Sequence, residues 1–293
     1  MIQNKNNNLS VLPFYEKRDM QYSRRSYSYG EVYPLYCLNN FLPPFQIIRE
    51  HSITYVPEIN LYDKNGKHIK DITSEVERTG LQLVEFEQFG YDVIVYPGNV
   101  VMDLKISEGM YYITFNTGDD IIYSEVFTVV NSVEGYLKLE WYDDENVIFD
   151  NGQIVYKNPL FRNILYLCAE LGKPDYEFEE EGEDRNGFFF PEKQISEKTY
   201  KFVILAPEYL CDVMRLIRMA DHIQITDKYG EVYNCDSFLI TPQWQTQGNL
   251  ASVTVEFQTN TVVKKIGRGY LMPNSGDFNN DFNNDFNNDF NIY

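Results

Sequence analysis

The sequence lacks the short motifs that mark the commonest enzyme classes. Its 293 residues contain no Gly-x-Ser-x-Gly nucleophile loop, no Gly-x-Gly-x-x-Gly dinucleotide loop and no Gly-x-x-x-x-Gly-Lys phosphate loop. The three histidines and four cysteines are scattered without the spacing of a zinc site, and no loop has the spacing of a calcium site. We therefore expect no catalytic residue, no cofactor and no bound metal.

Positive charge and long apolar runs are also scarce. The chain has 25 lysines and arginines against 44 aspartates and glutamates, a net charge of -19, which repels nucleic-acid phosphates and anionic lipid. No run of 18 apolar residues could cross a bilayer, and the asparagine-rich start lacks the apolar core of a secretory signal. We expect neither nucleic acid nor membrane as a partner, and we expect the chain in a cytoplasm or in a particle assembled there.

Aromatic residues, by contrast, are abundant. The chain contains 24 Tyr and 20 Phe, and such side chains suit the half-buried surface of a pleated sheet. From Tyr33 to Val130, six or more short strand patterns are separated by turns such as Asn65-Gly66. This spacing predicts an immunoglobulin-like β-sandwich over residues 33–133. Within it, the alternation of Tyr91–Tyr96 predicts one packed face and one face open to solvent or a neighbour.

The clearest helix signal follows Pro207. Leu210, Val213, Met214 and Ile217 fall at i, i+3, i+4 and i+7, which predicts a helix over residues 207–219. Strand patterns lie on both sides of it, at residues 200–205, 222–227, 231–240 and 250–260. These segments read strand, helix, hairpin, strand and belong to a second part of the chain, which we place at residues 134–268. The expected fold class is therefore mostly β.

Two segments of this second half have patterns that differ from those of the strands around them. In residues 158–172, Asn158, Pro159 and Gly172 fit the cap, first turn and stop of a helix, yet the same segment also fits a strand buried on both faces. Residues 175–184 hold seven carboxylates, a cluster typical of a solvated loop.

The two ends of the sequence differ from the middle. Residues 1–32 predict an extended arm that either contacts another subunit or packs on its own domain. The candidate subunit contacts in this arm are Tyr15, Tyr22, Arg24, Arg25, Tyr27 and Tyr29. Residues 269–293 include an Asp-Phe-Asn-Asn repeat from Asp277 to Phe290 and predict a flexible, low-complexity tail whose phenylalanines could anchor to a partner.

Only two tryptophans are present, and each admits two interpretations. Trp141 and Trp244 lie among polar residues on predicted strands, where an aromatic plane can stack on a sugar ring or pack in the core. We take Trp141 and Trp244 as the candidate glycan contacts.

Three segments of the second half carry a resemblance to a known protein class. Residues 179–194, 198–217 and 248–265 resemble virion structural proteins of bacteriophages and prophages of Bacteroidales bacteria. The order of elements is also similar to the β-sandwich of phage tail-tube, distal-tail and tail-hub proteins, in which one helix covers a sheet. The resemblance therefore implies a second β-sandwich with one covering helix over residues 134–268. The resemblance covers Trp141 to Lys265 and implies that residues 163–170 are extended, which favours the strand.

The resemblance implies a non-enzymatic component of a phage tail, baseplate or neck, located in the virion. Such a protein would act through contacts with other copies of itself and with other virion proteins. The alternative function is a carbohydrate- or cell-surface-binding β-sandwich module that contacts a host-surface glycan.

Overall fold

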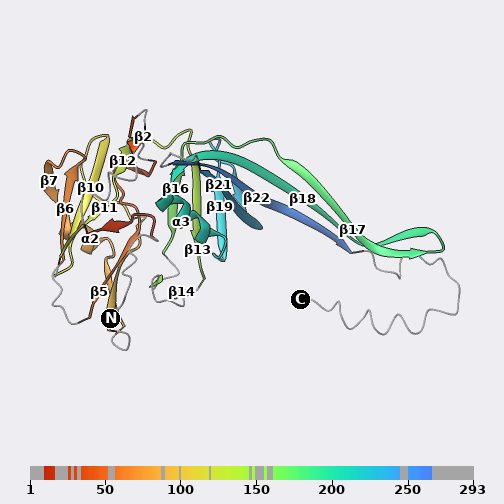
Figure 1. The fold of residues 1–293 in the computed structure, drawn as a ribbon, viewed down its shortest axis with the longest axis horizontal. Coiled ribbons are helices and arrows are strands. Elements are labelled where there is room, and N and C mark those ends of the chain that lie inside the picture. Colours follow the sequence, from red (N-terminus) through yellow and green to blue (C-terminus); the bar gives the residue numbers. More distant parts are fainter. Residues whose placement is uncertain are drawn as a thin grey trace. The chain divides into compact units, whose positions relative to one another are not determined.

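A computed structural model describes residues 10–16, 26–27, 30–31, 34–51, 57–86, 90–98, 100–118, 120–144, 147–148, 155–156, 161–244 and 250–265 (Figure 1). Strands dominate this part of the chain, together with the helices α2 (Thr73–Arg78) and α3 (Glu208–Ile217). The predicted mostly-β class is confirmed. The chain divides into two units, one formed by residues 1–174 and 200–259 and the other by residues 175–199 and 260–293.

The largest sheet of unit 1 has 11 strands. Its main path is β1 (Phe14–Tyr15), β11 (Ile121–Ser124), β10 (Gly109–Asn116), β12 (Phe127–Val130), β4 (Tyr36–Leu38), β16 (Asn163–Leu167), β13 (Leu137–Tyr142), β19 (His222–Thr226) and β20 (Val232–Asn234). Off this path, β6 (Glu58–Asp63) pairs with β10, and β7 (His68–Asp71) pairs with β6.

Strand β4 joins the two halves of the sequence in this sheet. It pairs in parallel with β12, where Cys37 lies opposite Val129, and antiparallel with β16, where Tyr36 lies opposite Tyr166. The predicted domain boundary between residues 133 and 134 is therefore wrong, because one hydrogen-bonded sheet crosses it. The local sequence shows that β4 is a strand but carries no information about its distant partners.

A second layer covers the first-half strands. It consists of β5 (Phe45–Glu50), β9 (Tyr91–Tyr96) and β8 (Gln82–Phe86), in the order β5-β9-β8. Phe45 stacks on Tyr96 with ring centroids 5.1 Å apart and meets Phe115 of β10 edge-on at 6.3 Å. These contacts join the two sheets in one core, so this half has the layered packing predicted for a sandwich.

Strand β9 differs from its sequence pattern. All six residues from Tyr91 to Tyr96 are buried, whereas the alternation predicted one open face. Ile94 and Tyr96 belong to the main core, and Val93 and Val95 belong to a second cluster that includes Phe161. The prediction failed because Phe161, far along the chain, takes part in covering the second face.

The predicted helix of the second half is confirmed as α3. Leu210, Val213 and Met214 of α3 are buried in the core shared with β21 (Ser237–Trp244) and with residues 250–259 of β22 (Leu250–Lys265). Residues 163–167 form β16, so the strand interpretation of the ambiguous segment is confirmed. The short pairs β2 (Ser26–Tyr27) with β3 (Gly30–Glu31) and β14 (Val147–Ile148) with β15 (Val155–Tyr156) complete unit 1.

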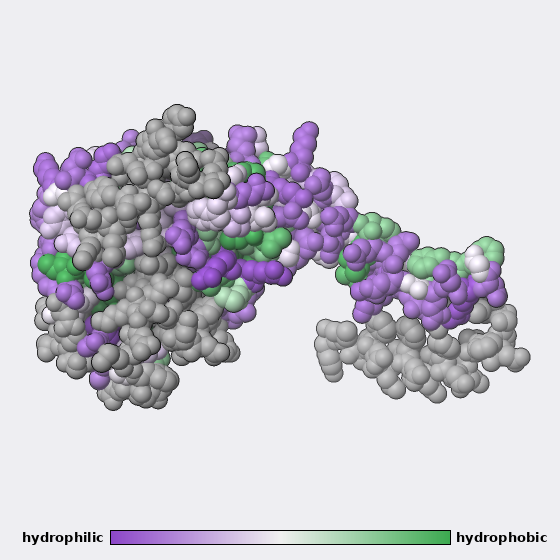
Figure 2. Space-filling model, viewed as in Figure 1, coloured by the Kyte–Doolittle hydropathy of each residue, from purple (hydrophilic) through white to green (hydrophobic). Residues whose placement is uncertain are grey.

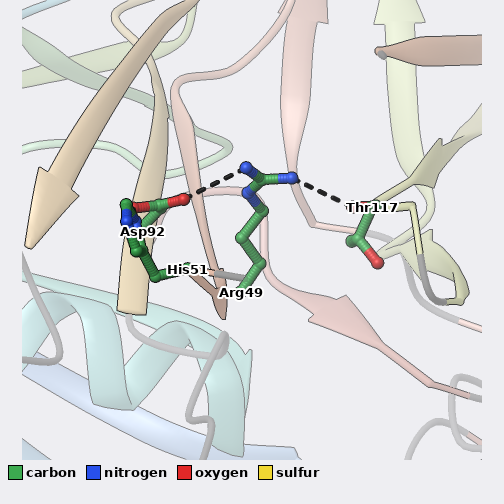
Figure 3. A network of polar contacts seen from close by, with 4 residues as sticks. All are labelled: Arg49, His51, Asp92 and Thr117. Carbon is green, nitrogen blue, oxygen red and sulfur yellow. Dashed lines mark hydrogen bonds and ion pairs between the residues drawn. The ribbon is translucent and has the colours of Figure 1, made fainter. Parts of the chain in front are cut away.

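A buried ion pair fastens β5 to β9. Nη2 of Arg49 lies 3.0 Å from Oδ2 of Asp92, and both side chains are almost completely buried (Figure 3). Nδ1 of His51 lies 2.7 Å from the other carboxylate oxygen of Asp92, and Nη1 of Arg49 lies 3.5 Å from the backbone oxygen of Thr117. Removing one partner of such a pair leaves an uncompensated charge in the interior.

We therefore predict that Asp92→Ala lowers the free energy of unfolding by about 3–5 kcal/mol. The double variant Arg49→Met, Asp92→Leu should lose less, because it removes both charges together. Asp103→Ala, which breaks an exposed ion pair with Lys105, is the matched control and should change the free energy by less than about 1 kcal/mol. Urea unfolding followed by circular dichroism measures all three, and an Asp92→Ala variant as stable as the control would contradict the prediction.

Candidate functional site

Unit 2 contains a long two-stranded hairpin. Strand β17 (Asp175–Arg185) pairs antiparallel with the first part of β18 (Phe188–Pro207), and Figure 1 shows the two running side by side. The turn between them is Asn186-Gly187, in which both residues have positive φ, 52° and 83°. Two such residues produce the backbone twist that a tight hairpin needs.

The acidic segment 175–184 is thus a strand and not the predicted loop. Every residue of β17 is exposed, so its carboxylates keep their hydration while the backbone hydrogen-bonds to β18. Lys193 forms an ion pair with Glu181, and Arg185 forms one with Glu183, which offsets part of the repulsion. The sequence pattern captured the solvation of the carboxylates but not the strand, because the ladder depends on the partner β18.

Gly182 permits a close approach of the two strands. The register shifts between Glu181 and Gly182, and a Cβ added at Gly182 would lie 2.1 Å from the backbone oxygen of Phe190. No real side chain tolerates that distance, so a larger residue would force the strands apart at this point.

The hairpin exposes large aromatic side chains. Tyr176, Phe178, Phe188, Phe189 and Phe190 are between 45 and 72% exposed. Figure 2 shows hydrophobic and hydrophilic residues on this hairpin in separate groups. Exposed apolar groups gathered in this way mark interaction sites in soluble proteins.

The two faces of the hairpin differ in chemistry before the register shift. Side chains opposite one another across a strand pair lie on the same face. Tyr176 and Phe178 face the same way, opposite Lys198 and Ser196 respectively. The alternate positions of β17, Asp175, Glu177 and Glu179, form a carboxylate row on the other face. Before the shift, Tyr176 and Phe178 therefore lie on one face, the aromatic face, and three carboxylates lie on the other. Beyond the shift both faces carry phenylalanines, because Phe189 alternates with Phe188 and Phe190.

Unit 1 has a second candidate surface, which we call the outer face. It is the side of β4, β16 and β13 that carries Tyr36, Lys138, Glu140, Ile164 and Tyr166, whereas Leu137, Leu139, Leu165 and Leu167 point into the core. Burial raises the pKa of the Tyr36 and Tyr166 hydroxyls, so both remain neutral donors at physiological pH. Tyr36 also meets Tyr136 edge-on at 5.0 Å.

Two ion pairs that share Glu140 lie on the outer face. Oε1 of Glu140 accepts from Nη1 of Arg162 at 2.8 Å, and its other oxygen accepts a short hydrogen bond from Lys138. Burial alone would raise the pKa of Glu140, but the hydrogen bonds and positive charges of Lys138 and Arg162 outweigh it and hold the pKa below its ordinary value. The Arg162 guanidinium also lies 4.1 Å above the Tyr142 ring.

Three aspartates, Asp143, Asp144 and Asp221, lie close together next to His222. Oδ1 of Asp143 accepts from the backbone N–H of Asp221, and Oδ2 of Asp221 accepts from the backbone N–H of Asp144, both at 3.1 Å. Burial raises the pKa of Asp143. These reciprocal bonds join the end of β13 to the start of β19, which assigns the aspartates a structural role. Among the described residues, no group of three or more His, Cys, Asp or Glu is placed to hold a metal.

The structure describes only part of the arm that was predicted to contact other subunits. Tyr15 is buried, pairs with Tyr123 and donates its hydroxyl to Glu125 at 3.3 Å, so it packs on its own unit. This outcome matches the self-packing alternative, and the prediction of a subunit contact at Tyr15 is wrong. Tyr22, Arg24, Arg25 and Tyr29 lie outside the described residues, and Tyr27 is described only through its backbone in β2.

The two tryptophans differ in their exposure to solvent. Trp141 is 4% exposed in the main core, so it offers no ring to a sugar and its assignment as a glycan contact is wrong. Leu137, Leu139 and Trp141 occupy alternate positions of one strand, a signal that favours burial. Trp244 is 48% exposed at the end of β21, and glycan contact through it stays a prediction.

Comparison with known proteins adds little. No family model and no curated protein matches the sequence. One similar solved structure is a complex of Dpr2 Ig1-Ig2 with DIP-Theta Ig1-Ig3, at 10% identity, with 82% of this chain and 90% of that chain covered and a TM-score of 0.15. A TM-score of this size carries no conclusion about fold or function. In the described part of the chain, no helix is long and apolar enough to cross a membrane.

The Glu140 contacts predict a pH-dependent contribution to stability. Because the folded-state pKa is lowered, ionised Glu140 stabilises the fold fully above the unfolded pKa of about 4.3 and loses this effect as the pH falls through the folded value. The difference in unfolding free energy between the wild type and Glu140→Gln should therefore be constant from pH 7 to pH 5 and shrink below about pH 4.3. Urea unfolding at each pH measures it, and a difference that grows on acidification would contradict this assignment.

Proposed function

We propose that the protein is a non-enzymatic assembly component that acts by docking its hairpin onto other subunits. The observation that carries the proposal is the exposure of five large aromatic side chains on the 175–199 hairpin. A two-stranded hairpin cannot bury aromatic residues within itself, and isolated hairpins are marginally stable in water. A partner surface that covers the aromatic face supplies the missing burial.

The charges of β17 support contact through the face of the hairpin and oppose contact through its edge. Strand β17 is an edge strand of a four-stranded sheet with the order β17-β18-β22-β21, and such an edge is a template for pairing with another chain. Two β17 edges brought together would set carboxylates against carboxylates at close range. The aromatic face carries Tyr176 and Phe178, and beside them Lys198 supplies a positive charge for an acidic neighbour.

The assembly that we propose is a phage tail, baseplate or neck, where subunits of the chain contact one another and other virion proteins. The support for this setting is the sequence resemblance of the second half together with the observed order of β18, α3, β19, β20, β21 and β22. Mass spectrometry of purified particles released by cells that carry the gene tests it. The protein should be a stoichiometric component of the particles, and its absence from them would rule out the setting.

Self-association tests the docking itself. We predict that Tyr176→Ser, Phe178→Ser and Phe189→Ser combined weaken self-association by at least about 100-fold, because aromatic anchors dominate interface energies. The matched control is Tyr229→Ser, since Tyr229 is 83% exposed in the turn between β19 and β20. Sedimentation velocity over a concentration series measures both variants.

A second hairpin variant tests whether docking depends on the geometry of the hairpin as well as on its aromatic side chains. Gly182→Val leaves every aromatic residue in place but forces the strands apart, so it should also weaken self-association. A wild-type protein that stays monomeric at the highest concentration, or a Tyr229→Ser variant as impaired as the triple variant, would refute docking through the hairpin.

A further inference from the structure

Unit 1 contains a pocket that the hairpin proposal does not use, which we call the tyrosine pocket. It lies on β6, β10 and β11, three strands that pair side by side in the large sheet (Figure 1). Its volume is about 290 Å³, close to the lower limit of roughly 300 Å³ for ligand sites in proteins. An apolar cavity of about 150 Å³ holds benzene, so the tyrosine pocket has room for a six-membered ring with polar substituents.

The strand register gathers the lining of the pocket on one face of the sheet. Three cross-strand pairs join β6 to β10 there, namely Tyr62 with Tyr112, Asn60 with Thr114 and Glu58 with Asn116. The residues between them lie in the core, among them Ile59, Leu61, Ile113 and Phe115. The face turned away from the core is therefore polar at one end and aromatic at the other.

Glu58 is the centre of a hydrogen-bond network at the polar end. Its Oε1 accepts from Nδ2 of Asn60 at 3.2 Å, and its Oε2 accepts from Nδ2 of Asn116 at 3.3 Å. The backbone N–H of Gly118 donates to Oδ1 of Asn116 at 3.0 Å. Nε2 of His68 lies 3.1 Å from Oδ1 of Asn60. Both amides are therefore held with their nitrogen atoms toward the carboxylate.

This network suits a ligand that donates and accepts hydrogen bonds at once. A carboxylate has about four acceptor positions and a side-chain amide has two N–H donors, so Glu58, Asn60 and Asn116 have capacity beyond the bonds among themselves. Thr114 adds a hydroxyl to the lining. An ammonium group only donates and a carboxylate only accepts, whereas a hydroxyl does both. The polar end therefore matches a set of neighbouring hydroxyls.

Tyrosine rings form the aromatic end. The rings of Tyr62 and Tyr112 stack with centroids 5.3 Å apart and planes 10° apart, and the ring of Tyr123 lies 6.4 Å from that of Tyr112. Tyr112 is buried, whereas Tyr62 and Tyr123 are only partly buried against it and both line the pocket. A tyrosine ring offers an apolar surface for C–H groups.

The charges near the pocket oppose an anionic ligand. In residues 58–71 and the described part of residues 109–125, the carboxylates are Glu58, Asp63, Asp71, Asp120 and Glu125. The basic residues of the same segments are Lys64, Lys67, His68 and Lys70. Because the carboxylates outnumber the basic residues, a phosphate, sulfate or uronic acid gains no net attraction there. A neutral ligand avoids this repulsion.

From these observations we infer that the tyrosine pocket binds a neutral sugar ring of a glycan. The hydroxyls of the sugar bond to Glu58, Asn60 and Asn116, and its C–H face packs on Tyr62 and Tyr123. One hexose in so small a pocket should bind with a Kd of about 1 mM. The inference does not depend on the hairpin, which belongs to unit 2.

Saturation-transfer difference NMR on the full chain tests the inference at this affinity. The probes are the methyl glycosides of glucose, galactose, mannose and N-acetylglucosamine, with methyl glucuronide as the anionic comparison. Irradiation of aromatic protein protons should saturate the ring C–H protons of at least one neutral probe. Absence of transfer to every neutral probe, or equal transfer to methyl glucuronide, would overturn the inference.

Variants locate the binding of the strongest neutral probe. Glu58→Gln keeps the shape of the side chain but loses the charged acceptor, and it should weaken binding by at least about tenfold. Its matched control is Glu77→Gln, on the exposed side of α2 and outside the pocket lining. Tyr62→Leu should cause a similar loss, and Tyr229→Leu is its control. Unchanged binding in both pocket variants, or an equal loss in the controls, would overturn the inference.

A photo-cross-link on the wild-type chain provides a readout that does not depend on how the variants fold. A diazirine derivative of the strongest neutral probe should label residues 58–66, 112–116 or 121–123. Labelling found only elsewhere, for example at Trp244, would overturn the inference. The triple hairpin variant should bind the probe as the wild type does, so a failure of hairpin docking and a failure of this inference are distinguishable.

Discussion

The structure depends on an unequal distribution of hydrophobic burial between its two units. In unit 1, one cluster of buried side chains links the strands of both sequence halves, from Phe14 to Phe257. In unit 2, β17 has no buried residue, although the hairpin carries some of the largest apolar side chains of the chain. Exposed aromatic area has an unfavourable free energy in water, which association removes. This uncovered aromatic area is the basis for the proposal that the hairpin docks onto a partner.

Strands β18 and β22 each contribute residues to both units. The last part of β18 alternates strictly, with Phe202 and Ile204 buried and Val203 and Leu205 exposed. Residues 250–259 of β22 place Val253, Val255 and Phe257 in the core of unit 1. Within unit 1, residues 200–207 of β18 and 250–259 of β22 are thus fixed by packing. Twist and spacing at the far end of the hairpin are set locally, by Asn186-Gly187 and Gly182.

The sequence predicted features that depend on neighbours along the chain. The i, i+3, i+4, i+7 pattern located α3, and Asn65-Gly66 located the β6–β7 turn, where Gly66 has a φ of 90°. The mostly-β class followed from composition and strand spacing. The acidic nature of residues 175–184 correctly predicted their solvation.

Features that depend on distant partners were not predictable in this way. The pairing of β4 with β12 and β16, the double burial of β9 and the strand state of β17 each require a segment remote in sequence. Residues 101–107 show the converse case: Met102, Leu104 and Ile106 are buried at alternate positions, yet no strand forms there. The outer face could not be predicted from the sequence either, because β4, β16 and β13 come from separate segments.

The most direct test of hairpin docking is hydrogen–deuterium exchange of the wild-type protein at several concentrations. The account predicts that amides in residues 175–199 exchange progressively more slowly as concentration rises, while amides of the β19–β20 hairpin, residues 222–234, exchange at a constant rate. Exchange in residues 175–199 that is independent of concentration, in samples that do self-associate, would contradict the account.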